Sequence, residues 1–146
     1  MSTIREIMSK IVVSLRPDAT LMEAVKTLNR HRISGAPVVT AQGEIVGFVS
    51  DEDLHDVLFD ESVRNEPVSA FMTTSVQSVA PHDPISTAAS LLAMYGVRRL
   101  PVVENGHFIG VVTRRDLFTH MLRHPEPLSE PLFELIPSLG ECVTHR

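Results

Sequence analysis

One short pattern, Gly-x-x-Ser/Thr-x-x-Asp, occurs twice in the sequence and holds the residues best suited to bind a ligand. The first copy contains Ser50 and Asp53, and the second contains Thr113 and Asp116. A carboxylate supplies hydrogen-bond acceptors, and a helix that starts at the pattern presents unpaired N–H groups to an anion. The same spacing also fits a helix N-cap with an acidic residue three positions later. Both interpretations stay open, because a cap would fix the position from which a ligand is bound.

The charges around the two copies have opposite signs. Two further acids lie inside the first copy, whereas Arg114 and Arg115 lie inside the second. Arg98 and Arg99 precede the second copy where the first has small neutral residues. Guanidinium groups suit phosphate oxygens, whereas acids repel them, so we expect a phosphorylated ligand to prefer the second copy. The first copy would be empty or would take a ligand with little negative charge. The alternative for the arginines is a solvated or inter-subunit salt bridge.

Other reactive residue types lack partners in the sequence. His120 and His124 are four residues apart and share one helix face, but no third ligand has metal-site spacing with them. We interpret them as a surface pair. Cys142 has no recognisable partner for a nucleophile's role. No nucleophile elbow, P-loop or dinucleotide-binding glycine pattern is present, so we expect no catalytic residues, no metal site and no enzymatic activity.

Composition narrows the class of protein further. The chain has 146 residues and a formal net charge of −5, and this negative charge does not indicate nucleic-acid binding. Its single cysteine excludes an intrachain disulfide and suits a reducing compartment. The apolar run from Ile11 to Leu15 is too short for a signal peptide or a membrane span. We therefore expect a soluble cytoplasmic protein.

The sequence contains two copies of one internal repeat. Pro17 matches Pro81 and Pro37 matches Pro101 at a spacing of 64 residues, which becomes 63 after one deletion at a turn. Apolar spacing and turn residues predict the order β-α-β-β-α in each copy, a mixed α/β fold. The helical spacing includes Leu21, Ala24 and Leu28 and, after Ser50, Leu54, Val57 and Leu58, and Asn105-Gly106 is a strong hairpin-turn signal. The predicted strands are 11–15, 36–40 and 45–50, then 76–79, 100–104 and 108–113. The predicted helices start near residues 21, 51, 85 and 114.

Four segments follow from this repeat. Residues 1–60 form the first copy, 61–67 a polar linker, and 68–124 the second copy. Residues 125–146 contain prolines that exclude a long helix, yet this segment keeps several large apolar side chains. We expect this tail to pack on the body of the protein or on a partner.

The two copies resemble CBS motifs. The first reads Ile33-Ser-Gly-Ala-Pro-Val-Val and then Gly47-Phe-Val-Ser-Asp-Glu-Asp-Leu, and the second reads Val97-Arg-Arg-Leu-Pro-Val-Val and then Gly110-Val-Val-Thr-Arg-Arg-Asp-Leu. The resemblance covers about residues 1–124. It implies two CBS domains packed sheet to sheet with pseudo-two-fold symmetry, a Bateman module, with two related clefts that bind adenosyl ligands. It also implies a homodimer.

The same resemblance assigns roles to individual residues. The Asp of each pattern would hold the ribose hydroxyls, and the Ser or Thr would lie near the phosphate. Val13 and Gln77 would contact base or ribose, and Ile33 and Val97 would line the purine slot. The full set of expected ligand-binding residues is Val13, Ile33, Ser34, Gly35, Ser50, Asp53, Gln77, Val97, Arg98, Arg99, Thr113 and Asp116.

The resulting hypothesis is a regulatory module that senses an adenosyl ligand and signals to a partner or to its own dimer. AMP, ADP or ATP are the expected ligands, S-adenosylmethionine and NAD are further possibilities, and no cofactor is required. The alternative is a structural protein-interaction module with vestigial clefts and an unidentified protein partner. We expect no nucleic-acid or membrane partner.

Overall fold

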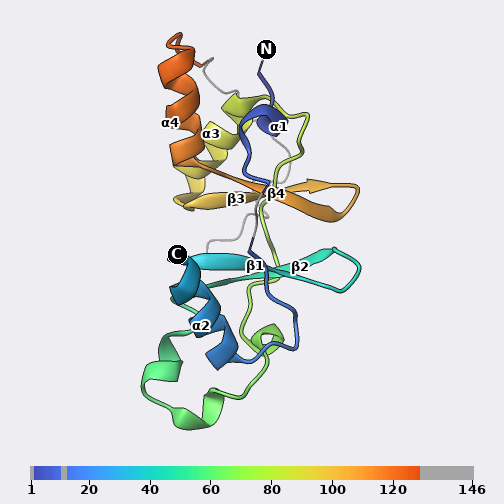
Figure 1. Cartoon of the computed structure of the whole chain (residues 1–146), viewed down its shortest axis with the longest axis vertical. Coiled ribbons are helices and arrows are strands. Elements are labelled where there is room, and N and C mark those ends of the chain that lie inside the picture. The colour runs from blue at the N-terminus through green and yellow to red at the C-terminus, as the bar shows by residue number, and fades with distance from the viewer. Residues whose placement is uncertain (1, 11–12, 129–146) are drawn as a thin grey trace. The chain divides into compact units, whose positions relative to one another are not determined.

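A computed structural model describes residues 2–10 and 13–128, which form two compact units. Residues 13–76 make one unit, called here the Ser50 unit (Figure 1). Residues 2–10 and 77–128 belong to the other, called the Thr113 unit. The predicted packing of the apolar tail and the position of Cys142 lie outside the described residues. No helix in the described ranges is long and apolar enough to cross a membrane.

The Ser50 unit holds one α-helix, one hairpin and three 3-10 helices. Thr20 and Glu23 close a capping box at the first turn of the α-helix, with hydrogen bonds of 3.0 and 2.7 Å. The elements are α2 (Leu21–His31), β1 (Gly35–Val39), β2 (Ile45–Ser50), η1 (His55–Leu58), η2 (Glu61–Val63) and η3 (Val68–Ala70).

The helix predicted after Ser50 is not an α-helix. The chain makes turns from Asp51 and then a single 3-10 helix, η1. Acidic residues dominate this stretch, and Glu52 and Asp56 stand four apart, a spacing at which like charges destabilise an α-helix. The final helix of the repeat is therefore complete only in the second copy.

The Thr113 unit has the complete set of elements. They are α1 (Ile4–Ile7), α3 (Ile85–Tyr95), β3 (Arg99–Glu104), β4 (His107–Thr113) and α4 (Arg114–Arg123). The β3–β4 turn uses Asn105 and Gly106 at φ 54° and 81°, the left-handed geometry that the Asn-Gly pair predicted. The mixed α/β expectation is confirmed in both units.

The short strands that were expected to open each repeat are reduced to single bridges. Leu15 pairs in parallel with Val38, and Val79 pairs in parallel with Val102. Each makes two backbone hydrogen bonds, of 2.9 and 2.7 Å at Leu15 and of 3.0 and 2.8 Å at Val79. Residues 11–12 of the first strand lie outside the described ranges.

The segments that precede these bridges are exchanged between the repeats. Ser9, from the first copy, pairs antiparallel with Val111 in the second copy's hairpin, and Thr73 pairs with Phe48 in the first copy's hairpin. Their backbone hydrogen bonds measure 2.8 and 3.2 Å for the first pair and 2.8 and 2.9 Å for the second. The compact units therefore do not begin and end where the sequence repeats do.

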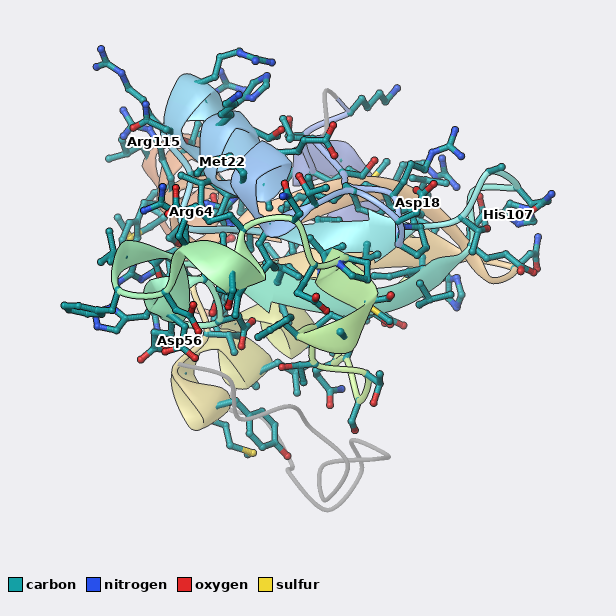
Figure 2. The ribbon with its side chains drawn as sticks, turned by 90° about the horizontal axis from the view of Figure 1, so that it is seen from below. Asp18, Met22, Asp56, Arg64, His107 and Arg115 are labelled. Atoms are coloured by element: carbon teal, nitrogen blue, oxygen red, sulfur yellow. The ribbon has the colours of Figure 1, made fainter. Side chains whose placement is uncertain are left out.

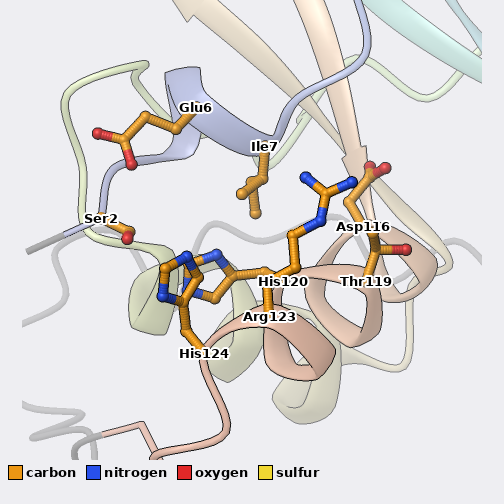
Figure 3. A pocket seen from close by; sticks show the side chains of 8 residues that line it. All are labelled: Ser2, Glu6, Ile7, Asp116, Thr119, His120, Arg123 and His124. Atoms are coloured by element: carbon orange, nitrogen blue, oxygen red, sulfur yellow. The ribbon is translucent and has the colours of Figure 1, made fainter.

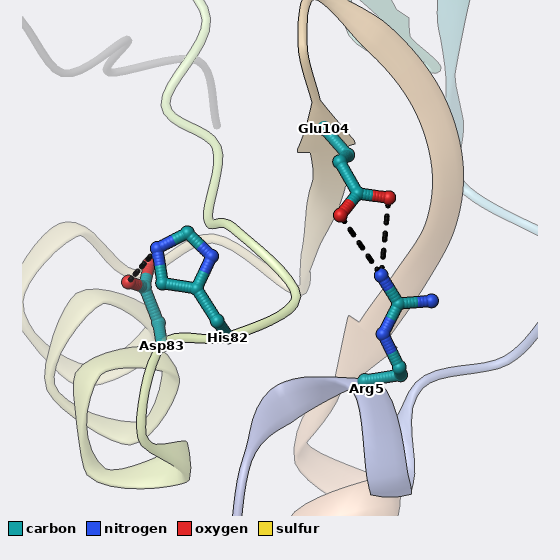
Figure 4. Close-up of polar contacts among 4 residues, drawn as sticks. All are labelled: Arg5, His82, Asp83 and Glu104. Carbon is teal, nitrogen blue, oxygen red and sulfur yellow. Dashed lines mark hydrogen bonds and ion pairs between the residues drawn. The ribbon is translucent and has the colours of Figure 1, made fainter.

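Helix α1 is anchored to the Thr113 unit mainly by burial. Ile4 is fully buried, and its amide donates to the Asp83 carbonyl at 2.9 Å. One guanidinium nitrogen of Arg5 reaches both carboxylate oxygens of Glu104 at 3.0 Å (Figure 4). Both side chains are about half exposed (51% and 45%), so this ion pair contributes little beside the burial of Ile4.

The cores follow the predicted helix faces. Leu21, Ala24 and Leu28 of α2 are buried against β1 and β2 residues, and the corresponding residues of α3 occupy the core of the Thr113 unit. Each unit thus positions the last residue of its hairpin, Ser50 or Thr113, at the edge of its own core.

Candidate ligand-binding site

The Thr113 pattern is a complete capping box at the start of α4. The Thr113 amide donates to Asp116 Oδ2 at 2.8 Å, the Thr113 hydroxyl lies 3.1 Å from the same oxygen, and the Asp116 amide donates to Thr113 Oγ1 at 3.3 Å. The cap interpretation is confirmed here. Within the described part of the chain, Asp116 Oδ1 accepts no hydrogen bond, so the cap and an acceptor for a ligand hydroxyl coexist in one carboxylate.

The Ser50 pattern keeps the carboxylate half of this arrangement. Asp53 Oδ2 accepts the Ser50 amide at 2.8 Å and lies 3.4 Å from the Ser50 hydroxyl. The Asp53 amide donates to the Ser50 carbonyl at 3.0 Å, and a turn follows in place of a helix. A turn presents fewer aligned N–H groups than an α-helix, so this copy attracts an anion less strongly.

Arg99 is the most unusual residue near Thr113. It lies directly opposite Thr113 in the β3–β4 ladder, where side chains on one face are neighbours. Its Nε is buried and has no hydrogen-bond partner among the described residues. Burial, and then the nearby charge of Arg98, lowers the pKa of Arg99 below its ordinary value. A buried guanidinium donor without a partner is unfavourable in the protein alone.

The other arginines divide into different roles. Arg114 turns toward α3 and donates to the Leu92 carbonyl at 2.9 Å, where it satisfies one of the last carbonyls of that helix. Arg98 and Arg115 are exposed. No ion pair joins any of these arginines to an acid in the ranges that the structure describes, so the salt-bridge alternative finds no intrachain support there.

Gly35, which occupies the place of Arg99 in the first copy, has a packing reason to be glycine. A Cβ at Gly35 would lie 2.7 Å from the ring of Phe48 and 3.0 Å from the Val49 carbonyl. Ser34 supplies its carbonyl to the Asp51 amide at 2.8 Å. The Ser50 unit therefore has an aromatic wall where the Thr113 unit has a guanidinium.

The glycine that opens each pattern is required by the exchanged segments. A Cβ at Gly110 would lie 2.8 Å from the Ser9 carbonyl oxygen and 3.0 Å from the Met8 sulfur. In the Ser50 unit, a Cβ at Gly47 would lie 2.8 Å from Met72 Cγ and 2.9 Å from the Thr73 carbonyl oxygen. These glycines therefore admit the neighbouring backbone, and this role was not visible in the sequence.

The remaining residues that were expected to bind a ligand are divided between the two units. Val13 and Ile33 lie in the Ser50 unit and are half-buried, and Ile33 packs against its core. Gln77 and Val97 lie in the Thr113 unit with Arg98, Arg99, Thr113 and Asp116, and Val97 packs against that core. Contact of any of these residues with a ligand stays a prediction.

A pocket of about 250 Å³ opens between α1 and α4 with Asp116 on its wall (Figure 3). Asp116 was an expected ligand-binding residue, His120 and His124 were interpreted as a surface pair, and the other lining residues were not predicted. The full lining is Ser2, Glu6, Ile7, Asp116, Thr119, His120, Arg123 and His124. Helical spacing from Asp116 indicates Thr119, His120 and Arg123, but nothing in the sequence places α1 beside them.

The two histidines of this pocket stack on each other. Their ring centroids are 4.6 Å apart, with 28° between the ring planes. The ranges that the structure describes contain no group of three or more His, Cys, Asp or Glu side chains arranged to hold a metal ion. The pocket is therefore a mixed polar site with an acid at each end, Glu6 and Asp116, and a guanidinium from Arg123.

Known proteins similar to this chain include both short and long ones. A CBS domain-containing protein of Dictyostelium discoideum is 32% identical over 139 residues, covering 86% of this chain and 94% of the relative. The MJ1225 protein of Methanocaldococcus jannaschii is 30% identical over 113 residues, covering 77% of this chain. This chain spans 40% of the length of that relative.

Solved structures match the fold closely. CBSX2, determined in complex with AMP, superposes with a TM-score of 0.77 at 28% identity, covering 86% of this chain and 100% of that one. The CBS domain pair of protein MJ0100, determined with 5′-methylthioadenosine and S-adenosyl-L-methionine, gives a TM-score of 0.71 at 24% identity, covering 86% and 98%.

The two copies of the repeat also match a described domain family. The CBS domain model matches residues 4–60 and 68–123, together most of the chain. The resemblance drawn from the motifs is thereby confirmed, and the chain belongs to the CBS domain family, of which it carries two copies.

Proposed function

We propose that the chain is a regulatory module whose Thr113 unit binds a phosphorylated adenosyl ligand, with AMP, ADP or ATP as the candidates. The observation that carries this proposal is the buried Nε of Arg99, which has no hydrogen-bond partner among the described residues, in a residue that pairs with Thr113 in the ladder. A phosphate that reached this donor would satisfy it. The AMP complex of the similar CBSX2 supports the ligand class.

The ribose would be held by Asp116. Its Oδ2 is used by the cap, and its Oδ1 can accept a hydroxyl. The first turn of α4 adds aligned N–H groups that favour a negative charge beside Thr113. One carboxylate, one hydroxyl and one guanidinium thus supply complementary partners for a ribose phosphate.

The Ser50 unit is the weaker anion site in this proposal. It lacks a counterpart of Arg99, because Gly35 admits the Phe48 ring, and it carries Asp51 and Glu52 inside the pattern. Acids beside a phosphate raise the free energy of the complex. This unit would stay empty or take an adenosyl ligand with little negative charge.

The proposed module regulates a partner protein or its own assembly and does not catalyse a reaction. Ligand binding changes a partner or the protein's own assembly only if the ligand favours one arrangement over another. A structural interaction module with vestigial clefts is the second candidate. The exposed apolar side chains on α4 favour it, since they form a surface without any ligand.

Isothermal titration calorimetry against AMP, ADP, ATP, NAD and S-adenosylmethionine tests the proposal. Asp116→Ala should weaken nucleotide binding at least tenfold, an effect of about 1.4 kcal/mol. Asp53→Ala is the matched control, because it removes the same carboxylate-to-amide hydrogen bond in the other unit. Millimolar or weaker binding of every ligand, or equal effects of the two variants, would refute the assignment.

A further inference from the structure

The two units close their first long helix in different ways. In the Ser50 unit, the amide of Arg32, the C-cap residue of α2, donates to the Leu28 carbonyl, so this helix closes with its own backbone. At the repeat spacing of 64 residues, Leu92 is the equivalent of Leu28. Among the described residues, the amide of the C-cap residue Gly96 donates to no carbonyl of α3. The Leu92 carbonyl instead accepts a hydrogen bond from Arg114 Nη2 at 2.9 Å.

The segments that enter and leave each hairpin are also joined differently in the two units. In the Ser50 unit, the Asp51 amide donates to the Ser34 carbonyl at 2.8 Å. The equivalent residues of the second copy are Arg114 and Arg98, and no backbone hydrogen bond joins these two in the ranges that the structure describes. The Arg114 side chain therefore supplies a link in the second copy where the first copy uses its backbone.

The Arg114 link joins the two groups of residues that are expected to bind the ligand in this unit. Arg114 is the first residue of α4, directly after the N-cap residue Thr113. Its acceptor Leu92 is buried in the last turn of α3, and the chain runs from there to Val97 and Arg99. A charged donor makes a stronger hydrogen bond to a carbonyl than a neutral donor does. One side-chain bond thus helps to set the position of the α4 cap relative to the end of α3.

We propose that Arg114 is a positioning residue of the ligand site, which holds the α4 cap against α3 and does not contact the ligand. This inference rests on the proposed function, because it concerns the same site. The capping box between Thr113 and Asp116 is local and would survive without Arg114, but its position relative to Arg99 would change. The Ser50 unit has Asp51 at this place, and an ionised carboxylate cannot donate to a carbonyl. The link therefore belongs to the second copy alone.

Hydrogen exchange of the full chain without ligand tests the link itself. Arg114→Met keeps the apolar stem and removes the donor, so amide exchange should rise roughly tenfold at the end of α3 and the start of α4. Arg114→Lys keeps a charged donor and should restore part of the protection. Arg115→Met is the matched control, because Arg115 is the next residue, lies at the surface (Figure 2) and makes no hydrogen bond among the described residues. Unchanged exchange in Arg114→Met would overturn the proposal.

Calorimetric titration with AMP and with adenosine separates positioning from contact. Loss of a positioning residue should weaken both ligands, because adenosine also needs the α4 cap in place, whereas loss of a phosphate contact should weaken AMP alone. We expect Arg114→Met to raise the Kd of both roughly fivefold and Arg114→Lys to recover part of this loss.

Two results of these titrations would refute the positioning role. Weaker binding of AMP alone would make Arg114 a phosphate contact, and unchanged binding of both ligands would mean that the α4 cap is positioned without it. If the unmodified chain binds neither ligand, the proposed function fails and the positioning role fails with it. The link detected by hydrogen exchange would then stand as a structural one, so the two failures are distinguishable.

Discussion

Replacing Arg99 with methionine should stabilise the fold and weaken nucleotide binding at the same time. The guanidinium Nε is buried without a partner among the described residues, and burial lowers the pKa of this group, so the protein holds it at a cost. Methionine keeps most of the apolar stem and removes the buried Nε donor. The proposed ligand would lose the guanidinium of the residue that pairs with Thr113 in the ladder.

The two effects have different magnitudes. A buried unsatisfied donor costs about 1–3 kcal/mol, and methionine should recover about 1 kcal/mol of this because the side chain is half-exposed. For a chain of this length that corresponds to a rise of about 3 °C in Tm. Loss of a charge-assisted hydrogen bond to phosphate costs about 1.5–3 kcal/mol, or roughly 10- to 150-fold in Kd.

Differential scanning calorimetry and isothermal titration calorimetry measure the two quantities on the same preparations. Arg98→Met is the matched control, since Arg98 is exposed and should change the free energy of unfolding by less than about 0.5 kcal/mol. A lower Tm for Arg99→Met would mean that the guanidinium is satisfied within the fold. Unchanged nucleotide affinity would remove Arg99 from the site, and either result would refute the reasoning.

Three further predictions concern the scaffold. Gly110→Ala should cost about 1–3 kcal/mol by chemical denaturation, because its Cβ would collide with the Ser9 carbonyl; an unchanged midpoint would show that the exchanged segment moves freely. Ile4→Ala should cost about 2–5 kcal/mol, because Ile4 is fully buried, and a smaller loss would mean that α1 is held by its polar contacts. Hydrogen bonds from the Ser62 hydroxyl and amide lower the pKa of Asp60, so carboxyl NMR should find this pKa below its ordinary value. Ser62→Ala removes the hydroxyl bond and should raise the pKa part of the way back. The stabilisation from these bonds exists above the unfolded-state pKa and is lost as the pH falls through the folded-state pKa.

The sequence was informative wherever the pattern is local. The spacing of Leu21, Ala24 and Leu28 identified the buried face of α2, and Asn105-Gly106 identified the β3–β4 turn, because each depends on residues that are neighbours along the chain. The capping box at Thr113 and Asp116 was likewise recognisable from a spacing of three.

Long-range features were not recognisable in this way. The pairing of Ser9 with Val111 joins residues about a hundred positions apart, and the sequence gives no periodicity that would select one hairpin over the other. That the Nε of Arg99 has no acceptor among the described residues depends on every group that surrounds it. The helix expected after Ser50 is a 3-10 helix, because charge repulsion along 51–56 outweighs the apolar spacing of Leu54, Val57 and Leu58.

Helix α4 connects the proposed ligand site with a surface that carries exposed apolar side chains. Its N-cap is Thr113, and its exposed patch begins at Phe118 and ends at Leu122, about 8–14 Å along the same helix axis. A phosphate at the cap would stabilise the first turn through its N–H groups and so fix the position of the whole helix. The first copy has turns and η1 in this place, without a complete helix to relay such an effect. Under the proposed function, placing the arginines and the complete helix in the same copy would give one unit both the stronger anion site and a helix that links this site to the surface.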